Sequence, residues 1–446
     1  MSRQFRTLLG VVLVFATILS ACAAPKAAPP AAPTAAPNKT QPTAAAPAQS
    51  SEPQTVEFWV FADWATGTAG DLFNTFIKEF EAANPGIKIN MVGKPGGDIE
   101  TGIVAGAGSG VVPDAFTLGL NFGTTATSTG IVQDVSQWFN AMPDAYKKQF
   151  NEAAMKALSS GGKVWGVPFT TYAVTLFRNK TILTKAGIDP AAGIKDWADF
   201  VDQCKKIKAA GYTCVPDVMQ DGGFLEDVIS GVGGQNGVSA DGKSTTITTD
   251  QVQKAIELIQ QLKPYSSEIG NWDQASTDQF TTNKLAFQYC GPWCDPGYLA
   301  AKKANPDFDY DYVLIPGASA DKFSGTYGGE WIGASTGPRA EAAFKWASFL
   351  ADAPQAKRMA TVLGRTVLNN TVMADPEVQK NALAMLGDAA TKHVFQDAVW
   401  FKYWPLEARV PFNDAIQSVK AGKATPVEAA KKTIDDLNKV LSSGPQ

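Results

Sequence analysis

The sequence of 446 residues contains a single histidine, His393. Ser-His-Asp and Cys-His systems need an imidazole beside the nucleophile, so one histidine in a helix-like segment excludes most of these enzymes. Zinc is disfavoured as well, because no second pair of residues has finger-like ligand spacing. A glycosidase with paired carboxylates stays open, since it needs only two acidic side chains that the fold brings together.

Neither a Gly-rich phosphate loop nor a hydrophobic run long enough to cross a bilayer occurs in the sequence. We therefore do not expect the chain to hydrolyse ATP. The apolar run Leu8–Leu19 follows two arginines and is too short to span, which is typical of a signal peptide. Leu19-Ser20-Ala21-Cys22 then resembles the lipobox of bacterial lipoproteins. We expect a signal peptide over residues 1–21 and a lipid, such as palmitate, on Cys22; an ordinary cleaved signal with an incidental cysteine is the alternative.

Residues 22–54 contain little besides Ala, Pro, Thr, Ser and Gln. Such a composition cannot bury enough apolar surface to offset the entropy of ordering. We expect a disordered tether that holds the following body away from the membrane, at roughly 3 Å per residue where it is polyproline-like.

The charge balance is mildly acidic. Removing Arg3 and Arg6 with the leader leaves 37 Lys and Arg against 43 Asp and Glu. An acidic body disfavours nucleic acid and an anionic membrane surface as main ligands.

Four cysteines remain in the body, and an exported protein is expected to pair them as disulfides. We expect local pairs, Cys204–Cys214 and Cys290–Cys294. The alternative is a redox centre at the second pair, but three residues separate these cysteines whereas the usual redox motif has two.

The body begins with a strand–helix–strand pattern. Residues 55–61 are rich in β-branched and aromatic residues, and apolar residues at helical spacing follow over residues 72–80. Asn84-Pro85-Gly86 ends the helix before a second alternating strand. A parallel sheet built in this way places ligands at the carboxyl ends of its strands, which puts Asp63 and Trp64 at a favoured edge.

These segments, and those that follow, resemble family 1 extracellular solute-binding proteins, the sugar receptors of ABC importers. The match rests on short motifs that occur in the family's order: Phe58-Trp59, Phe80 to Ile87, Val112 to Phe116, Gly130 to Val135, Lys163 to Phe169, Leu176 to Lys180, Ala186 to Ile188, Trp197 to Phe200, Leu285 to Phe287, Gly291 to Trp293 and Gly328-Gly329.

The resemblance implies an α/β, two-lobed periplasmic-binding-protein-like fold (type II) with a ligand cleft between lobes joined by a multi-crossing hinge. We expect lobe 1 to comprise residues 55–170 plus 315–352, and lobe 2 residues 171–314 plus 353–446. The crossings are then near Thr170–Thr171, Leu314–Ile315 and Ala351–Pro354. The implied protein is a monomer without a cofactor, anchored outside the cytoplasm, that closes on a sugar and delivers it to ABC permease subunits.

Matching positions one at a time gives candidate ligand contacts, each with a structural alternative. Asp63 and Trp64 suit a sugar's hydroxyls and apolar face, with an ordinary loop as the less favoured alternative. Asn121 is either a hydroxyl partner or a turn residue. Tyr172 follows the first crossing, where family members often carry a polar contact, with plain packing between the lobes as the alternative. Trp293 is expected to be a stacking platform unless it simply covers the disulfide.

Four further candidates follow from the same matching. Asp295 adds a hydroxyl acceptor beside the flanking cysteines, which depart from the family pattern. Glu330 and Trp331 follow Gly328-Gly329, although core packing is an equal alternative for the indole. Arg409 stands where relatives often carry an aromatic, so Trp400, Tyr403 and Trp404 either replace that contact or lie in the core.

The alternating Asp307, Asp309 and Asp311 suggest calcium only weakly, because the glycine and glutamate of a calcium loop are missing. We expect a solvated strand face and no metal. The acidic and aromatic candidates favour a neutral polyhydroxylated ligand over a phosphate, with a small cation as the alternative.

Overall fold

A computed structural model describes residues 53–220, 222–232, 237–239, 241, 243–271, 273–325, 327–393 and 409–443. The chain divides into two units, Met1–Ser50 and Ser51–Gln446, and every described residue lies in the second. The signal peptide, Cys22 and nearly all of the predicted tether therefore lie outside the described residues. None of the described helices is both long and apolar enough to cross a membrane.

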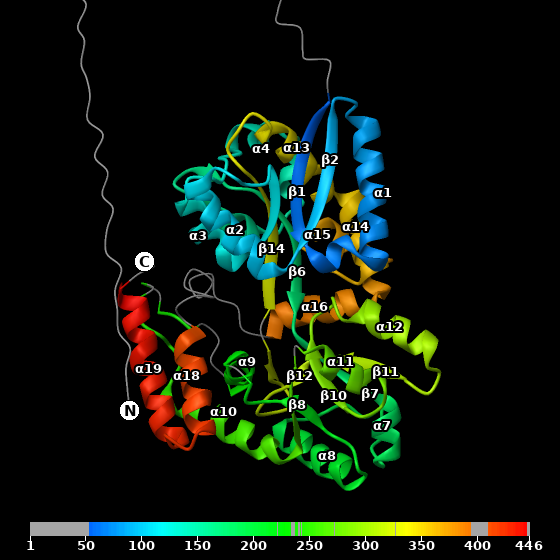
Figure 1. Cartoon of the computed structure of the whole chain (residues 1–446), viewed down its shortest axis with the longest axis vertical. Helices are drawn as coiled ribbons and strands as arrows, with labels where there is room; N and C mark the ends of the chain where they lie inside the picture. Colours follow the sequence, from blue (N-terminus) through cyan, green and yellow to red (C-terminus); the bar gives the residue numbers. More distant parts are fainter. Residues whose placement is uncertain are drawn as a thin grey trace, which may run out of the picture. The chain divides into compact units, whose positions relative to one another are not determined.

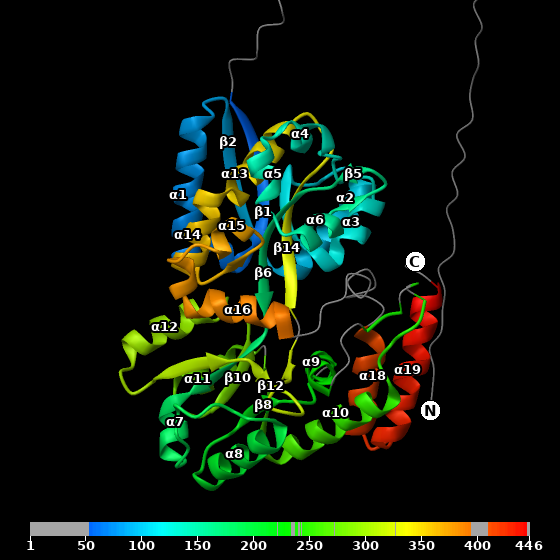
Figure 2. The same ribbon diagram turned by 180° about the vertical axis from the view of Figure 1, so that it is seen from behind.

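The first lobe is built on a six-stranded sheet of order β15-β6-β14-β3-β1-β2 (Figures 1 and 2). β1 pairs in parallel with β2 and β3, whereas β14 runs antiparallel to both β3 and β6. The strands are β1 (Gln54–Phe61), β2 (Ile87–Lys94), β3 (Ala115–Gly119), β6 (Val167–Ala173), β14 (Tyr327–Ala334) and β15 (Thr366–Val367).

Both faces of this sheet are covered by hydrophobic cores. Side chains alternate along β1, so successive residues point into opposite cores. Val56, Phe58 and Val60 point into one core and Trp59 into the other. In Figure 1, α1 and α14 cover one face, and α2 and α3 lie on the other side. The helices of this lobe are α1 (Gly67–Ala83), α2 (Gly96–Ser109), α3 (Gly123–Ser128), α4 (Ser136–Ala141), α5 (Asp144–Lys148), α6 (Glu152–Ala157), α13 (Ala340–Ala351), α14 (Ala353–Leu363), α15 (Asn370–Met373) and α16 (Ala382–His393), beside the short hairpin β4 (Ser159–Ser160) and β5 (Lys163–Val164).

The predicted strand–helix–strand start is confirmed. Along α1 the side chains of Leu72, Phe73, Phe76 and Phe80 recur every three or four residues and are buried against the sheet. The helix ends at Asn84, whose backbone N–H and side-chain amide both donate to the Phe80 carbonyl.

The second lobe has a three-stranded antiparallel sheet with β7 between β10 and β11. Its strands are β7 (Thr175–Asn179), β8 (Val215–Asp217), β9 (Ser266–Gly270), β10 (Phe287–Cys290), β11 (Tyr310–Val313), β12 (Ile315–Pro316) and β13 (Phe323–Ser324). Its helices are α7 (Lys180–Lys185), α8 (Trp197–Ala209), α9 (Gly223–Val232), α10 (Thr249–Leu262), α11 (Gln274–Thr281), α12 (Asp295–Ala304), α18 (Arg409–Lys420) and α19 (Pro426–Ser443).

Both predicted disulfides are confirmed. Cys204 in α8 bonds to Cys214 just before β8, and both residues are fully buried in the main core of the second lobe. Cys290 at the end of β10 bonds to Cys294 at the N-cap of α12.

The chain crosses between the lobes at places that differ from the predicted ones. The first passage lies between Ala173 and Thr175, a few residues after Thr170–Thr171. The second comes after Ser324 rather than near Ile315, because β12 and β13 form a hairpin and Ile315 is buried in the second-lobe core.

The predicted boundary at residue 353 is wrong. A crossing was expected near Ala351–Pro354, but Pro354 stands in the first turn of α14, where proline is tolerated. Ala356, Met359, Ala360 and Leu363 then pack in the first-lobe core, and β15 pairs with β6. The first lobe thus extends through α16, and the chain is in the second lobe again by Phe412.

Candidate functional site

Asp63 lies directly after β1, in the short 3₁₀ helix η1 (Ala62–Ala65), and forms an ion pair with Arg365. The Asp63 Oδ2 and Arg365 Nη2 atoms are 2.7 Å apart. The guanidinium also lies 4.1 Å from the centre of the Trp64 ring, a cation–π distance. Arg365 is almost entirely buried, while the Asp63 side chain keeps about a third of its surface exposed. The Asp63 carboxylate is therefore accessible to solvent, while the buried Arg365 guanidinium neutralises its charge.

Glu330 lies on β14 behind this pair and is 5% exposed. Its carboxylate accepts a hydrogen bond from the Thr170 hydroxyl on β6. Burial raises the pKa of Glu330 to about 7, although the Arg365 charge and the Thr170 hydrogen bond act in the opposite direction. The carboxyl group therefore changes charge near neutral pH.

Trp293 and Tyr172 meet edge to face, with ring centroids 5.4 Å apart and planes at 78°. Tyr172 comes from β6 of the first lobe and Trp293 from the loop between β10 and α12 of the second. A Cβ on Gly328 would lie 2.4 Å from the Tyr172 hydroxyl oxygen. This glycine therefore makes room for the tyrosine.

The Tyr172 hydroxyl is surrounded by negative charge. Burial is the main reason that its pKa is raised, and four carboxylates add to the effect: Glu330, Glu100, Glu226 and Asp227. Burial also raises the pKa of Glu100, on α2, to about 7. The hydroxyl stays protonated and able to donate at neutral pH.

A cavity of about 370 Å³ brings Asp63, Arg365 and Trp293 together. Both lobes contribute to its wall, which consists of Asp63, Thr66, Gly67, Thr68, Ala69, Pro292, Trp293, Pro296, Gly297, Ala300, Leu363 and Arg365. It combines an indole, two threonine hydroxyls, a carboxylate and a guanidinium. Such a wall suits a small solute that has hydroxyl groups and an apolar face.

A second cavity, of about 310 Å³, shares Thr68, Pro296, Ala300 and Leu363 with the first and includes Asp295. Asp295 is the first residue of α12 and accepts a 2.7 Å hydrogen bond from the Tyr310 hydroxyl. Burial raises its pKa. Asp295 is therefore next to the site rather than part of the wall that Trp293 lines.

Two predicted contacts are corrected, because both indoles are fully buried. Trp64 packs with Phe73 and Phe169 in one core of the first lobe and supports the Arg365 guanidinium from beneath. Trp331 packs against Phe116 in the other core and donates from its indole N–H to the Gly119 carbonyl.

The remaining candidates are not joined to this wall. Asn121 belongs to η2 (Leu120–Phe122), but its side chain lies outside the described residues, as do Trp400, Tyr403 and Trp404. Arg409 is the first residue of α18 and lines neither cavity. The arginine found in the wall of the 370 Å³ cavity is Arg365.

Sequence reasoning missed Arg365. The only local signal was its place just after Gly364, which ends α14 in the left-handed conformation with φ of 63°. That signal predicts a helix end and says nothing of the partner at Asp63, far away in the sequence.

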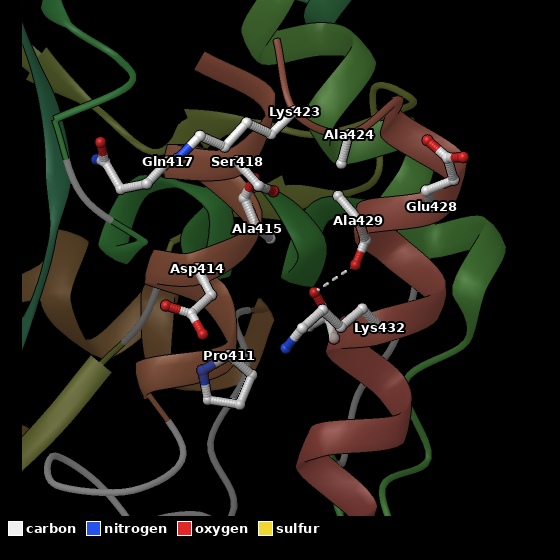
Figure 3. Close-up of a pocket in the computed structure, with 11 residues that line it drawn as sticks. Pro411, Asp414, Ala415, Gln417, Ser418, Lys423, Ala424, Glu428, Ala429 and Lys432 are labelled. Carbon is white, nitrogen blue, oxygen red and sulfur yellow. Dashed lines mark hydrogen bonds between the residues drawn. The ribbon is translucent and has the colours of Figure 1, made fainter. Parts of the chain in front are cut away.

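A larger cavity, of about 570 Å³, lies between α18 and α19 (Figure 3). Asp414 and Lys432 face each other there from the two helices, and the Thr433 hydroxyl donates to the Ala429 carbonyl. Of the described residues in its wall, none is aromatic and none is a predicted contact. We therefore place the candidate site at the Trp293 cavity.

Within the part of the chain that is described, no three His, Cys, Asp or Glu side chains are grouped to hold a metal ion. The aspartates of β11 and its approach pair with cations instead. Asp309 pairs with Lys180 and Lys302, and Asp311 with the buried Arg178.

Comparisons with known proteins agree with this architecture. The family described as bacterial extracellular solute-binding protein matches residues 75–385. An uncharacterised ABC transporter extracellular-binding protein of Pyrococcus horikoshii is 25% identical over 412 residues, which are 88% of this chain and 87% of that protein. The sn-glycerol-3-phosphate-binding periplasmic protein of Escherichia coli is 28% identical over 177 residues, 37% of this chain and 38% of that one.

Solved structures show the same fold. The GacH receptor of Streptomyces glaucescens, studied unliganded and with acarbose, superposes with a TM-score of 0.75 at 20% identity, covering 88% of this chain and 100% of that one. The maltotriose-binding protein of Thermus thermophilus gives 0.69 at 17% identity, covering 86% and 99%. The expected two-lobed α/β binding-protein fold is confirmed.

Proposed function

Because the chain belongs to the bacterial extracellular solute-binding protein family, we propose that it captures a carbohydrate between its lobes and delivers it to the permease of an ABC importer. The observation that carries this proposal is the wall of the 370 Å³ cavity. It combines the Trp293 indole of one lobe with the Asp63–Arg365 pair of the other. Sugar C–H groups pack on an indole face, while hydroxyls both donate to a carboxylate and accept from a guanidinium.

The charges around the cavity favour a neutral solute over a phosphate. Arg365 already pairs with Asp63, and its charge also acts on Glu330. A phosphate would need a cation that is free to pair with it. The structural neighbours whose ligands are known from their complexes include receptors for acarbose and maltotriose, which supports an oligosaccharide for this chain.

Closure of the lobes is the proposed capture step. A solute that contacts Trp293 and Asp63 together is held by groups from both lobes, so its binding energy favours the form in which they approach. The permease then recognises that closed form, and the solute leaves unchanged. Catalysis is not part of this proposal.

We further propose that Cys22 carries the lipid that anchors the protein on the outer side of the cell membrane. The lipobox-like Leu19-Ser20-Ala21-Cys22 and the tether-like composition after it support this anchor. Cells fed a clickable palmitate analogue are expected to label the wild-type chain and not Cys22→Ser. Equal labelling of the two chains would contradict the anchor.

Thermal unfolding across a solute panel tests the main proposal. Maltotriose, mannotriose, tagatose and acarbose are compared with glycerol 3-phosphate and with quaternary amines, using residues 23–446. A solute that binds only the folded protein stabilises it by about 2.7 kcal/mol at 100 times its Kd, which raises the melting temperature by several degrees. We expect this rise with a sugar.

Two other results would change the proposal. A response to amines alone would identify a cationic solute, the second candidate, which the four carboxylates around Tyr172 favour. Release of product from an oligosaccharide in the same samples would instead identify an enzyme.

A further inference from the structure

The loop that carries Trp293 is closed on itself by a covalent bond. Cys290 ends β10 and Cys294 is the N-cap of α12, so the disulfide spans a sequence separation of 4. Trp293 lies inside this small ring, next to Gly291 and Pro292. The ring leaves the backbone of the loop few alternative conformations.

The indole folds back over its own loop. A Cβ built on Gly291 would lie 2.1 Å from an indole carbon of Trp293, so only glycine leaves room for the ring in this position. The edge-to-face contact with Tyr172 restrains the indole on another side. Trp293 is thus restrained by the disulfide ring, by the packing of its indole over Gly291 and by its contact with Tyr172.

We propose that the Cys290–Cys294 disulfide is a positioning element for Trp293, and that solute affinity depends on it. The inference rests on the proposed function, since it assumes that Trp293 contacts the solute. Ordering a mobile aromatic loop during binding costs free energy that a loop already held in place does not lose. Breaking the disulfide therefore weakens binding through Trp293 even where the fold persists.

The second disulfide provides a matched control. Cys204–Cys214 also closes a short loop, but both cysteines are fully buried in the main core of the second lobe and neither lines the Trp293 cavity. Cys204→Ala/Cys214→Ala is expected to lower the melting temperature without changing solute affinity by more than about twofold. A general effect of losing a disulfide would appear in both variants.

The first readout needs no solute. The mature chain is labelled with 5-fluorotryptophan, and Trp293→Phe assigns the fluorine resonance of Trp293. In Cys290→Ala/Cys294→Ala this resonance is expected to shift and broaden, whereas in the control variant it stays in place. An unchanged Trp293 resonance in the first variant would overturn the proposal, whether or not a solute has been found.

The second readout is the Kd for maltotriose, or for the panel solute that raises the melting temperature most. Cys290→Ala/Cys294→Ala is expected to weaken binding about tenfold in the wild-type background and to have no further effect in Trp293→Ala. A tenfold loss in both backgrounds would show that the disulfide does not act through Trp293. Wild-type protein that binds no solute would instead count against the proposed function, and the fluorine spectra would still decide the positioning.

Reduction of the folded protein covers the case in which the variant fails to fold. Cys294 is partly exposed, whereas Cys204 and Cys214 are fully buried. A dithiothreitol thiolate attacks the Cys294 sulfur, Cys290 leaves and takes up a proton, and the second thiol of the reagent then displaces Cys294. The protein gains two thiols and the reagent becomes a cyclic disulfide. The Trp293 resonance should shift on this reduction and return to its position on reoxidation. A resonance that does not change on reduction would also overturn the proposal.

Discussion

Replacing Trp293 with alanine is expected to weaken solute binding about 30- to 100-fold, the effect of losing a central aromatic contact worth about 2–3 kcal/mol. Among the described residues that line the cavity, Trp293 has the largest side chain and is the only aromatic one. Its loss removes the apolar face on which sugar C–H groups would pack. Isothermal titration with the solute from the panel measures the change, and Trp293→Phe should keep part of the affinity.

Trp165→Ala is the matched control for this substitution. Trp165 is also partly exposed, donates to the Ser160 hydroxyl, and lies beside the β4–β5 hairpin of the first lobe, away from the cavity wall. Its removal should affect stability and leave the Kd within about twofold of wild type. If Trp293→Ala binds as well as Trp165→Ala, the stacking contact has to be abandoned.

Replacing Arg365 with methionine is expected to lower the free energy of unfolding by about 2–4 kcal/mol, since it leaves buried carboxylate charge without its partner. The lower part of this range allows for Asp63, which solvent reaches. Solute binding should be lost as well, because Asp63 loses the ion pair that orients it. Urea unfolding and titration measure the two effects separately.

The loss of stability should also depend on pH, through Glu330. Its pKa is about 7 in the folded protein against an ordinary 4.5, so the stability it contributes is present below pH 4.5 and is lost as the pH rises through about 7. Arg365 limits this loss by favouring the carboxylate. Without the guanidinium the pKa rises further, so Arg365→Met should be more destabilising at pH 8 than at pH 5. The same loss at both pH values would contradict the assigned role of Glu330.

Arg358→Met is the control, because Arg358 lies on α14, the helix that ends just before Arg365, but its ion pair with Glu79 leaves 35% and 41% of the two side chains exposed. An exposed pair of this kind contributes about 0–1 kcal/mol. Its removal should therefore have a small effect at either pH.

Local patterns predicted the start of the fold well, and the contacts between distant segments poorly. The spacing of Phe73, Phe76 and Phe80 was enough to predict α1, because a helix exposes one face to solvent and buries the other. Residues 328–334 of β14 are all buried. Glu330 and Ile332 point to one side of it and Trp331 to the other, and both sides are covered by cores. Nothing in the order of these residues distinguishes a buried indole from one that faces a ligand.

The candidate site was predicted only in part for the same reason. Asp63 was found because it follows the end of a parallel strand, where ligand contacts are common. Trp293 was found because Gly291-Pro292-Trp293 matches a motif of the resembled family. Arg365 depends on a pairing with Asp63 between opposite ends of the first lobe's sequence. The boundary at residue 353 was taken from the family resemblance, and it failed because α14 packs in the first-lobe core, a contact between distant segments that no local pattern shows.

The order of the strands also determines when the first lobe can be completed during synthesis and export. β14 lies between β3 and β6, yet the whole central stretch of the second lobe comes off the ribosome before it. Until then β3 and β6 each have an open edge, which is the kind of surface that attracts other unfolded chains. Pairings between such distant segments form slowly. The first-lobe sheet of the emerging polypeptide therefore stays open until β14, which ends at Ala334, has been translated.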